Sequence, residues 1–162
     1  MNALPPAVQP WPIGAGARYH PAPANARVAR GDSFGRFRCR SGRSFDVHIE
    51  LFAHRRVVVV PARIGVADAG CTYPLRTETP TGVVAVANAG RWTLGDLFEI
   101  WGQRLTASRL LSFNGRVSVF VGGRRRVGDP RSVVLNRHAQ IVIEVSGYVP
   151  PHPSYLFPNG SR

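Results

Sequence analysis

Strict alternation of apolar and polar residues from residue 45 onward predicts the first strand of the chain. The apolar positions are Phe45, Val47, Ile49 and Leu51, and the polar positions between them are Asp46, His48 and Glu50. Because neighbouring side chains of a strand point to opposite faces, we expect one face to be buried and the other to be polar. The pattern continues through Ala53-His54 into residues 55–60, and Pro61 ends that second stretch. These residues are therefore predicted to form a β-hairpin.

Later parts of the chain repeat this β signal. Gly122-Gly123 has the composition of a two-residue hairpin turn, with alternating residues on both sides. The other segments that we expect to be extended are 72–77, 82–87, 116–121, 124–127 and 140–146.

Helical signals concentrate in residues 93–101. Thr93 is a good N-cap, Asp96 occupies the matching capping-box position, and Gly102 supplies a C-terminal stop. The apolar residues at helical spacing are Leu94, Leu97, Phe98 and Trp101. One face of this short helix is therefore predicted to be buried. A further helical turn is expected at residues 106–111.

Proline and glycine dominate both ends of the chain. Residues 1–34 are expected to form an extended arm without regular helix, in which Trp11 and Tyr19 anchor the arm to its own domain or to a neighbouring subunit. Residues 148–162 are expected to form a second proline-rich arm with aromatic residues that include Tyr155. The globular domain is then residues 35–147, and a chain of 162 residues that is 44% hydrophobic suffices for one core.

Strands, one short helix and further strands indicate the α+β class, with a mostly β, mixed sheet crossed by the helix. The order of hairpin, helix and strands resembles the β-grasp, or ubiquitin-like, architecture.

Several sequence blocks resemble a group of uncharacterised bacterial proteins that is common in actinobacteria and related high-GC lineages. The most specific blocks are Thr93-Leu94-Gly95-Asp96-Leu97-Phe98-Glu99-Ile100-Trp101-Gly102 and Gly128-Asp129-Pro130-Arg131. The resemblance covers residues 45–160 and brings no activity with it.

In many members of that group, histidines at the positions of residues 46–50 and 75–79 would suit a metal site on the sheet. This chain keeps only His48 there, and Ala85 and Ala87 of the next predicted strand offer no ligand. Because a transition metal needs three or four converging donors, His48, Asp46 and Glu50 are weak metal candidates, and a degenerate metal-binding domain is one alternative. We expect these three residues to form the solvated face of an edge strand.

The charge of the chain points to an anionic partner. The formal net charge is +12, and all 21 basic residues are arginines. GC-rich coding also produces such a bias, but guanidinium groups bind phosphates and carboxylates in either case. The arginines expected to bind a partner are Arg36, Arg38, Arg40, Arg55, Arg56, Arg124, Arg125 and Arg126. If the two hairpins that carry the later groups lie side by side, the groups would merge into one basic surface.

The two cysteines, Cys39 and Cys71, lack the spacing of a metal site. They would form a disulfide in an oxidising compartment, or remain buried thiols in the cytoplasm. The chain has no apolar stretch of membrane-spanning length and no secretory pattern at its start, so the default expectation is a cytoplasmic protein. Removal of an upstream signal, or a bridge between the cysteines, would indicate an extracytoplasmic one.

No pattern of nucleophilic catalysis and no phosphate-binding glycine motif occurs, so we expect neither an enzyme nor a cofactor. The leading hypothesis is a binding or assembly module, an accessory subunit that docks to an acidic protein partner or larger complex. Its docking residues would be the arginines, together with Trp11 and Tyr155 of the arms, through which homo-oligomers would also form. The alternative is a protein that binds the phosphates of RNA or DNA.

Overall fold

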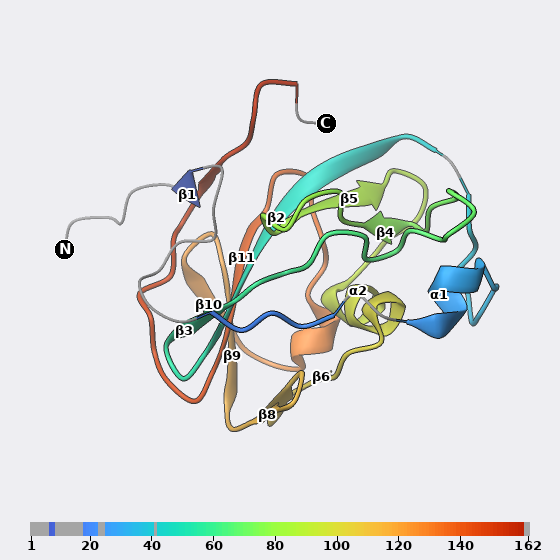
Figure 1. Ribbon diagram of the computed structural model, residues 1–162. Helices are drawn as coiled ribbons and strands as arrows, with labels where there is room; N and C mark the ends of the chain where they lie inside the picture. The colour runs from blue at the N-terminus through green and yellow to red at the C-terminus, as the bar shows by residue number, and fades with distance from the viewer. Residues whose placement is uncertain (1–6, 9–17, 23–24, 41, 161–162) are drawn as a thin grey trace.

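The computed structural model describes residues 7–8, 18–22, 25–40 and 42–160 (Figure 1). Its centre is a mixed sheet, which among the described residues has seven strands. The strands are β2 (Ser44–Ala53), β3 (Arg56–Val58), β4 (Leu75–Arg76), β5 (Val83–Ala87), β9 (Val117–Val121), β10 (Arg124–Arg126) and β11 (Gln140–Val145). The chain is therefore of the α+β class with mostly strands, as the sequence predicts.

Strand β2 lies at the middle of this sheet. The order is β10-β9-β11-β2-β5-β4, and β3 pairs with the end of β2. The long strands β2 and β11 are parallel, whereas the other pairs are antiparallel. The predicted hairpins form as β2–β3 and β9–β10, and Gly122 and Gly123 both have the positive φ that such a turn requires.

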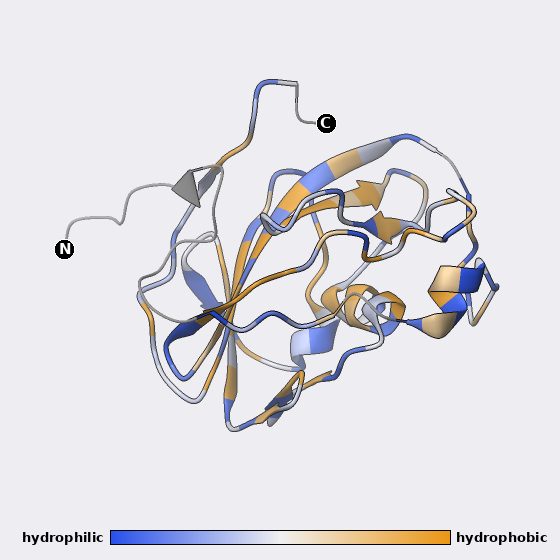
Figure 2. Cartoon of the chain, in the orientation of Figure 1, coloured by the Kyte–Doolittle hydropathy of each residue, from blue (hydrophilic) through white to orange (hydrophobic). Residues whose placement is uncertain are grey.

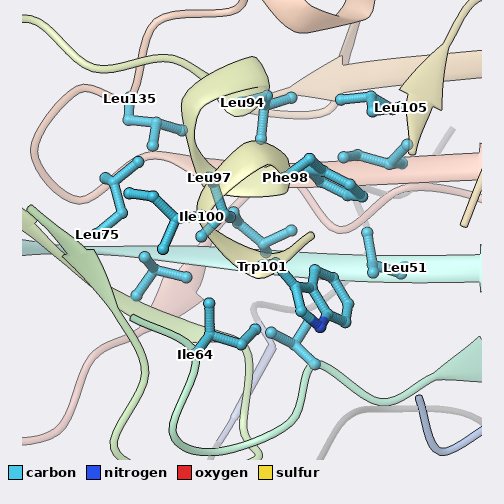
Figure 3. Close-up of a cluster of buried hydrophobic side chains, with 14 of the residues drawn as sticks. Leu51, Ile64, Leu75, Leu94, Leu97, Phe98, Ile100, Trp101, Leu105 and Leu135 are labelled. Carbon is cyan, nitrogen blue, oxygen red and sulfur yellow. The ribbon is translucent and has the colours of Figure 1, made fainter. Parts of the chain in front are cut away.

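Helix α2 (Leu94–Trp101) packs on one face of the sheet and confirms the predicted helix. The Thr93 side chain accepts a hydrogen bond from the Asp96 backbone N–H, and the Asp96 carboxylate accepts one from the Thr93 N–H, which completes the capping box. Gly102 ends the helix in the left-handed conformation. Its buried side chains are Leu94, Leu97, Phe98, Ile100 and Trp101, which meet the sheet in the main core (Figure 3).

Alternation along β2 divides its side chains between two buried faces. Val47, Ile49 and Leu51 point into the core beneath α2, whereas His48 and Glu50 lie on the opposite face. The central strands and α2 are mostly hydrophobic, and β10 at the sheet edge is hydrophilic (Figure 2). Because the side chains on both faces of β2 are buried, both faces of the central part of the sheet are covered.

The prediction of a single helix is wrong. A second helix, α1 (Ala26–Arg30), begins after the N-cap Asn25 and ends at Gly31, within the region expected to be an arm without helix. Val28 of this helix and Phe34 beyond it are buried in the main core. The prolines of this region end at Pro23, so nothing in residues 26–30 opposes a helix, and one turn is too short to show apolar periodicity.

Residues 106–111 also differ from the prediction. A small sheet forms there from β6 (Leu105–Thr106), β7 (Arg109–Leu110) and β8 (Phe113–Asn114), instead of a helical turn. Within the described residues, no helix combines the length and the apolar character that a membrane span requires.

The C-terminal segment, residues 148–160, runs back over its own chain. It contains β12 (Tyr155–Leu156), which pairs in parallel with β1 (Ala7–Val8). Tyr148 contacts Phe120, and Phe157 contacts His138. Trp11 lies outside the described residues. A short 3-10 helix, η1 (Pro130–Ser132), precedes β11.

Candidate docking cleft

Three alternate arginines project from one extended segment, residues 36–40. Phe37 points inward, with its ring centroid 5.1 Å from that of Phe34 and 6.0 Å from that of Trp92. Cys39 also points inward and is bonded to Cys71. Because the two intervening side chains are held inside, Arg36, Arg38 and Arg40 lie on the outer face of the segment.

The disulfide forms, so the alternative of buried free thiols is wrong. It joins residues 32 apart in sequence and ties the arginine segment to the chain just before β4. Next to it, the Arg40 N–H donates to the Thr72 carbonyl at 2.7 Å, and the Thr72 hydroxyl donates to the Arg40 carbonyl at 3.2 Å. One covalent bond and two hydrogen bonds therefore fix this wall.

A cleft of about 480 Å³ opens beside that wall. The arginine segment forms one side, and β4, the end of β5 and the loop before α2 form the other. Its lining residues are Arg36, Arg38, Arg40, Gly42, Arg43, Tyr73, Pro74, Arg76, Ala87, Asn88, Ala89 and Trp92. The cleft combines guanidinium groups with apolar and aromatic side chains.

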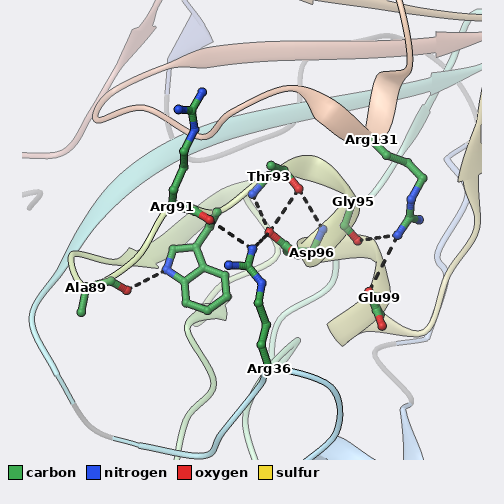
Figure 4. A network of polar contacts seen from close by, with 9 residues as sticks. Arg36, Ala89, Arg91, Thr93, Gly95, Asp96, Glu99 and Arg131 are labelled. Atoms are coloured by element: carbon green, nitrogen blue, oxygen red, sulfur yellow. Dashed lines mark hydrogen bonds and ion pairs between the residues drawn. The ribbon is translucent and has the colours of Figure 1, made fainter.

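Arg36 connects the cleft to the start of α2 (Figure 4). Its Nη2 lies 2.5 Å from Asp96 Oδ2 and donates to the Arg91 carbonyl at 3.1 Å. Its guanidinium carbon lies 4.4 Å from the centroid of the Trp92 ring, a cation–π distance. The Trp92 indole N–H in turn donates to the Ala89 carbonyl at 3.0 Å. This corner of the cleft is therefore rigidly held.

Positive charge exceeds negative charge at the cleft. Among the described residues, Arg38 donates to the carbonyls of Gly35 and Phe37, at 2.9 and 3.0 Å, and to no carboxylate. Arg76 lies 3.8 Å from Glu78, and apart from Asp96 no other described carboxylate is paired with a lining arginine. Arg40 and Arg43 are exposed and form no ion pair with a described residue.

The three arginine groups do not merge into one surface. Strand β11 lies between β2 and β9, so the two hairpins are not neighbours. Because β11 is parallel to β2 and antiparallel to β9, the tip at His54-Arg55 and the tip at Gly122-Gly123 lie at opposite ends of the sheet. Arg55 and Arg56 are exposed at one tip, whereas β10 and the cleft beside β4 occupy opposite edges.

The expectation of a solvated edge strand for Asp46, His48 and Glu50 is wrong. Strand β2 is central, His48 is 1% exposed and Glu50 is 4% exposed. Asp46 is half-buried, and its carbonyl accepts the His138 N–H at 2.8 Å. The strand is covered on this face because the C-terminal segment returns across it.

A polar network occupies part of this buried face, beside a small apolar cluster that includes Phe52 and Phe120. His48 Nδ1 lies 2.6 Å from Gln140 Oε1, and His48 Nε2 lies 2.9 Å from the Thr81 carbonyl oxygen. Gln140 Nε2 donates to Glu50 Oε2 at 3.1 Å, and His152 Nδ1 lies 3.0 Å from the same oxygen. Both ring nitrogens of His48 thus have protein partners. Within the described part of the chain, no three His, Cys, Asp or Glu side chains gather where they could hold a metal ion.

The C-terminal segment closes over this network. The Tyr155 ring stacks on His48, with centroids 3.6 Å apart and planes 6° apart. The Val149 N–H donates to Glu144 at 3.1 Å. Tyr155, predicted to contact a partner, is only 9% exposed and instead packs within its own chain.

Burial and hydrogen bonding shift three titrating groups here. Burial lowers the pKa of His48, and it raises the pKa of Glu144 to about 7. The hydrogen bond to Glu50 raises the pKa of His152. These pKa shifts occur where the C-terminal segment packs on the sheet. None of the three groups lines the cleft.

Of the residues that line the cleft, the sequence-based set of docking residues contains only Arg36, Arg38 and Arg40. The arginines and aromatic residues that it lacks are Arg43, Arg76, Tyr73 and Trp92. Arg43 follows the arginine segment closely, so the same sequence pattern could have identified it. The other three come from β4 and its flanks and from the start of α2, and no local pattern links them to residues 36–40. No protein-family model, curated protein or solved structure matches this chain.

Proposed function

We propose that the chain is a non-enzymatic binding module that docks, through the arginine-lined cleft, onto an acidic segment of a partner protein. The observation that carries the proposal is the charge of the cleft: five arginines line it, and two carboxylates pair with them. Arg40 and Arg43 form no ion pair with a described residue, and planar guanidinium groups bind carboxylates bidentately.

The apolar part of the cleft favours a peptide over a free small anion. Pro74, Ala87 and Ala89 are at least partly exposed among the arginines, beside the buried Tyr73 and Trp92 rings, and suit a hydrophobic side chain between two acidic residues. A volume of about 480 Å³ matches sites that bury a few residues or a small ligand. An acidic segment with one apolar residue therefore fits both the charge and the surface of the cleft.

The distribution of arginines favours protein over nucleic acid. A protein that binds a nucleic-acid backbone needs basic groups that follow successive phosphates. Here the arginine groups lie at two sheet edges and at one hairpin tip, separated by other strands. Nucleic-acid binding is therefore the rival outcome of the test below.

We infer that the fold is a variant of the β-grasp. The parallel pair of β2 and β11 at the centre, a hairpin on each side and α2 on one face support this inference. We likewise propose that the chain belongs to the uncharacterised bacterial group and serves as an accessory subunit. Docking is assigned to the cleft rather than to the C-terminal arm, because residues 148–160 pack on their own chain.

Fluorescence anisotropy tests the proposal, with a labelled Asp/Glu-rich peptide that carries one central Leu. The Arg40→Ala/Arg43→Ala variant should bind it roughly fivefold to thirtyfold more weakly than the wild type, since each exposed charge pair contributes about 0.5–1 kcal/mol. The Arg55→Ala/Arg56→Ala variant is the matched control, because it removes the same charge at the hairpin tip and should bind like the wild type.

Equal losses in the two variants would show that the peptide senses only net charge, and the cleft would not be a docking site. A single-stranded RNA oligonucleotide serves as competitor in the same assay. If RNA displaces the labelled peptide at a lower concentration than unlabelled peptide does, the nucleic-acid alternative is favoured. Displacement only by unlabelled peptide supports the protein partner.

A further inference from the structure

Strand β10 carries a second concentration of arginines, far from the cleft. It pairs with β9 through Arg124–Val121, Arg125–Phe120 and Arg126–Val119, and no other described strand pairs with its outer side. All three of its side chains are exposed. An unpaired strand edge presents backbone donors and acceptors that an added strand can use.

A hollow of about 340 Å³ lies along this strand. Its lining residues are Arg116, Arg125, Arg126, Ala107, Val117, Val127 and Gly128. Arg125 lies opposite Phe120, which packs on the face under the C-terminal segment, and Arg126 lies opposite Val119 of the main core. Arg125 and Arg126 therefore point to opposite faces of the sheet. Because both of them line the hollow, the hollow lies at the edge of the sheet.

The hollow also has an apolar component and no described counter-ion. Val127 is 98% exposed, next to the partly buried Val117. None of Arg116, Arg125 and Arg126 forms an ion pair with a described residue. Arginines at an edge can protect a sheet from aggregation, but this role explains neither a fully exposed valine nor the hollow beside it.

We propose that the β10 edge is a second docking site, which binds an extended acidic segment with one apolar residue by strand addition. Successive side chains of an added strand alternate between the two faces, so consecutive acidic residues would reach both Arg125 and Arg126. An apolar residue of the segment would cover Val127. This proposal rests on the proposed function in one respect, namely that both sites accept the same class of acidic segment.

The two sites lie at opposite edges of the sheet. In the order β10-β9-β11-β2-β5-β4, five strand spacings separate them, which amounts to about 24 Å. A short segment therefore fills one site at a time, and one chain holds two segments at once. The module would then bridge two acidic segments, from one partner or from two.

Isothermal titration of the full chain with the same Asp/Glu-rich peptide tests this proposal by stoichiometry. The wild type should bind two peptides. Arg125→Ala/Arg126→Ala should weaken one of the two by roughly fivefold to thirtyfold, and Arg40→Ala/Arg43→Ala should weaken the other. The Arg55→Ala/Arg56→Ala control should still bind two, and thermal unfolding should show that all variants remain folded.

A peptide with N-methylated amides at alternate positions tests strand addition itself. It keeps its side chains but loses backbone donors, so it should bind the cleft and fail at the β10 edge. With the unmodified peptide, a stoichiometry of one per chain that Arg40→Ala/Arg43→Ala weakens would overturn the second site and leave the proposed function standing. A stoichiometry of one per chain that only Arg125→Ala/Arg126→Ala weakens would overturn the cleft as a docking site instead. Two peptides that Arg125→Ala/Arg126→Ala does not affect would overturn the β10 site.

Discussion

Glu144 is one of the polar side chains that are deeply buried on the face under the C-terminal segment. Glu144 is 2% exposed and accepts one backbone hydrogen bond, from Val149. A carboxylate with so few donors is poorly solvated, and burial therefore raises its pKa to about 7 from an ordinary value of 4.5. The native state thus holds a proton on Glu144 up to a higher pH than the unfolded state does.

The stability of the wild type should consequently fall as pH rises from about 4.5 to 7, because the native state binds the extra proton in this window. Glu144→Gln removes this cost and keeps an oxygen that can accept the Val149 N–H. Relative to the wild type, the variant should gain roughly 2 kcal/mol of unfolding free energy between pH 5 and pH 8.

Urea unfolding at the two pH values measures this gain. The exposed Glu99→Gln substitution is the control and should show no comparable change between them. A Glu144→Gln effect of the same size at pH 5 and pH 8 would mean that the carboxyl does not titrate in this range.

At the scale of elements, helix α2 and the cleft share one carboxylate. Asp96 accepts from the Thr93 N–H at 2.9 Å and also pairs with Arg36. The same residue therefore completes the capping box of the helix and positions one corner of the cleft. Removing it should affect both.

Asp96→Ala should lower the unfolding free energy by about 1–2 kcal/mol, because the Thr93 N–H loses its capping-box acceptor and the ion pair with Arg36 is lost. It should not weaken acidic-peptide binding, because it removes a negative charge beside the cleft and releases the Arg36 Nη2 donor, while the Arg36 guanidinium still lies over Trp92. Thermal unfolding and anisotropy measure the two effects. Glu99→Ala on the exposed side of α2 is the control. An equal loss of unfolding free energy in that variant would show that the capping box and the ion pair of Asp96 make no specific contribution.

At the scale of the whole molecule, the disulfide joins the N-terminal part of the chain to the sheet edge. The segment that carries Arg38 and Arg40 belongs to no described strand or helix, and Cys39–Cys71 is its covalent tie. The bond therefore stabilises the fold and also places one wall of the cleft.

Replacing both cysteines, as Cys39→Ser/Cys71→Ser, should lower the unfolding free energy by about 2–4 kcal/mol, because the unfolded chain regains the freedom of a closed loop of this length. Peptide binding to the cleft should weaken in parallel, while binding at the β10 edge should not change. Titration of the variant, and of wild type treated with a dithiol reductant, measures both. Unaltered affinity at the cleft would show that hydrogen bonds alone hold the wall.

Local patterns predicted the elements whose information is local. The hairpin that begins at Phe45 and the helix that begins after Thr93 form as expected, because alternation, capping and helical spacing act within a few residues. Helix α1 escaped the prediction because one helical turn between loops has no periodic pattern to detect. The small sheet at residues 105–114 escaped it because its strands are only two residues long.

The sequence by itself determined which side chains of β2 share a face and that α2 buries one stripe, since both follow from the geometry of a single element. Only the tertiary structure decided that His48 and Glu50 lie under the C-terminal segment, and that Arg76 joins Arg36, Arg38 and Arg40 around one cleft. These contacts depend on strand order and on the path of the returning chain. Both are set by packing between residues far apart in sequence, which no local pattern records.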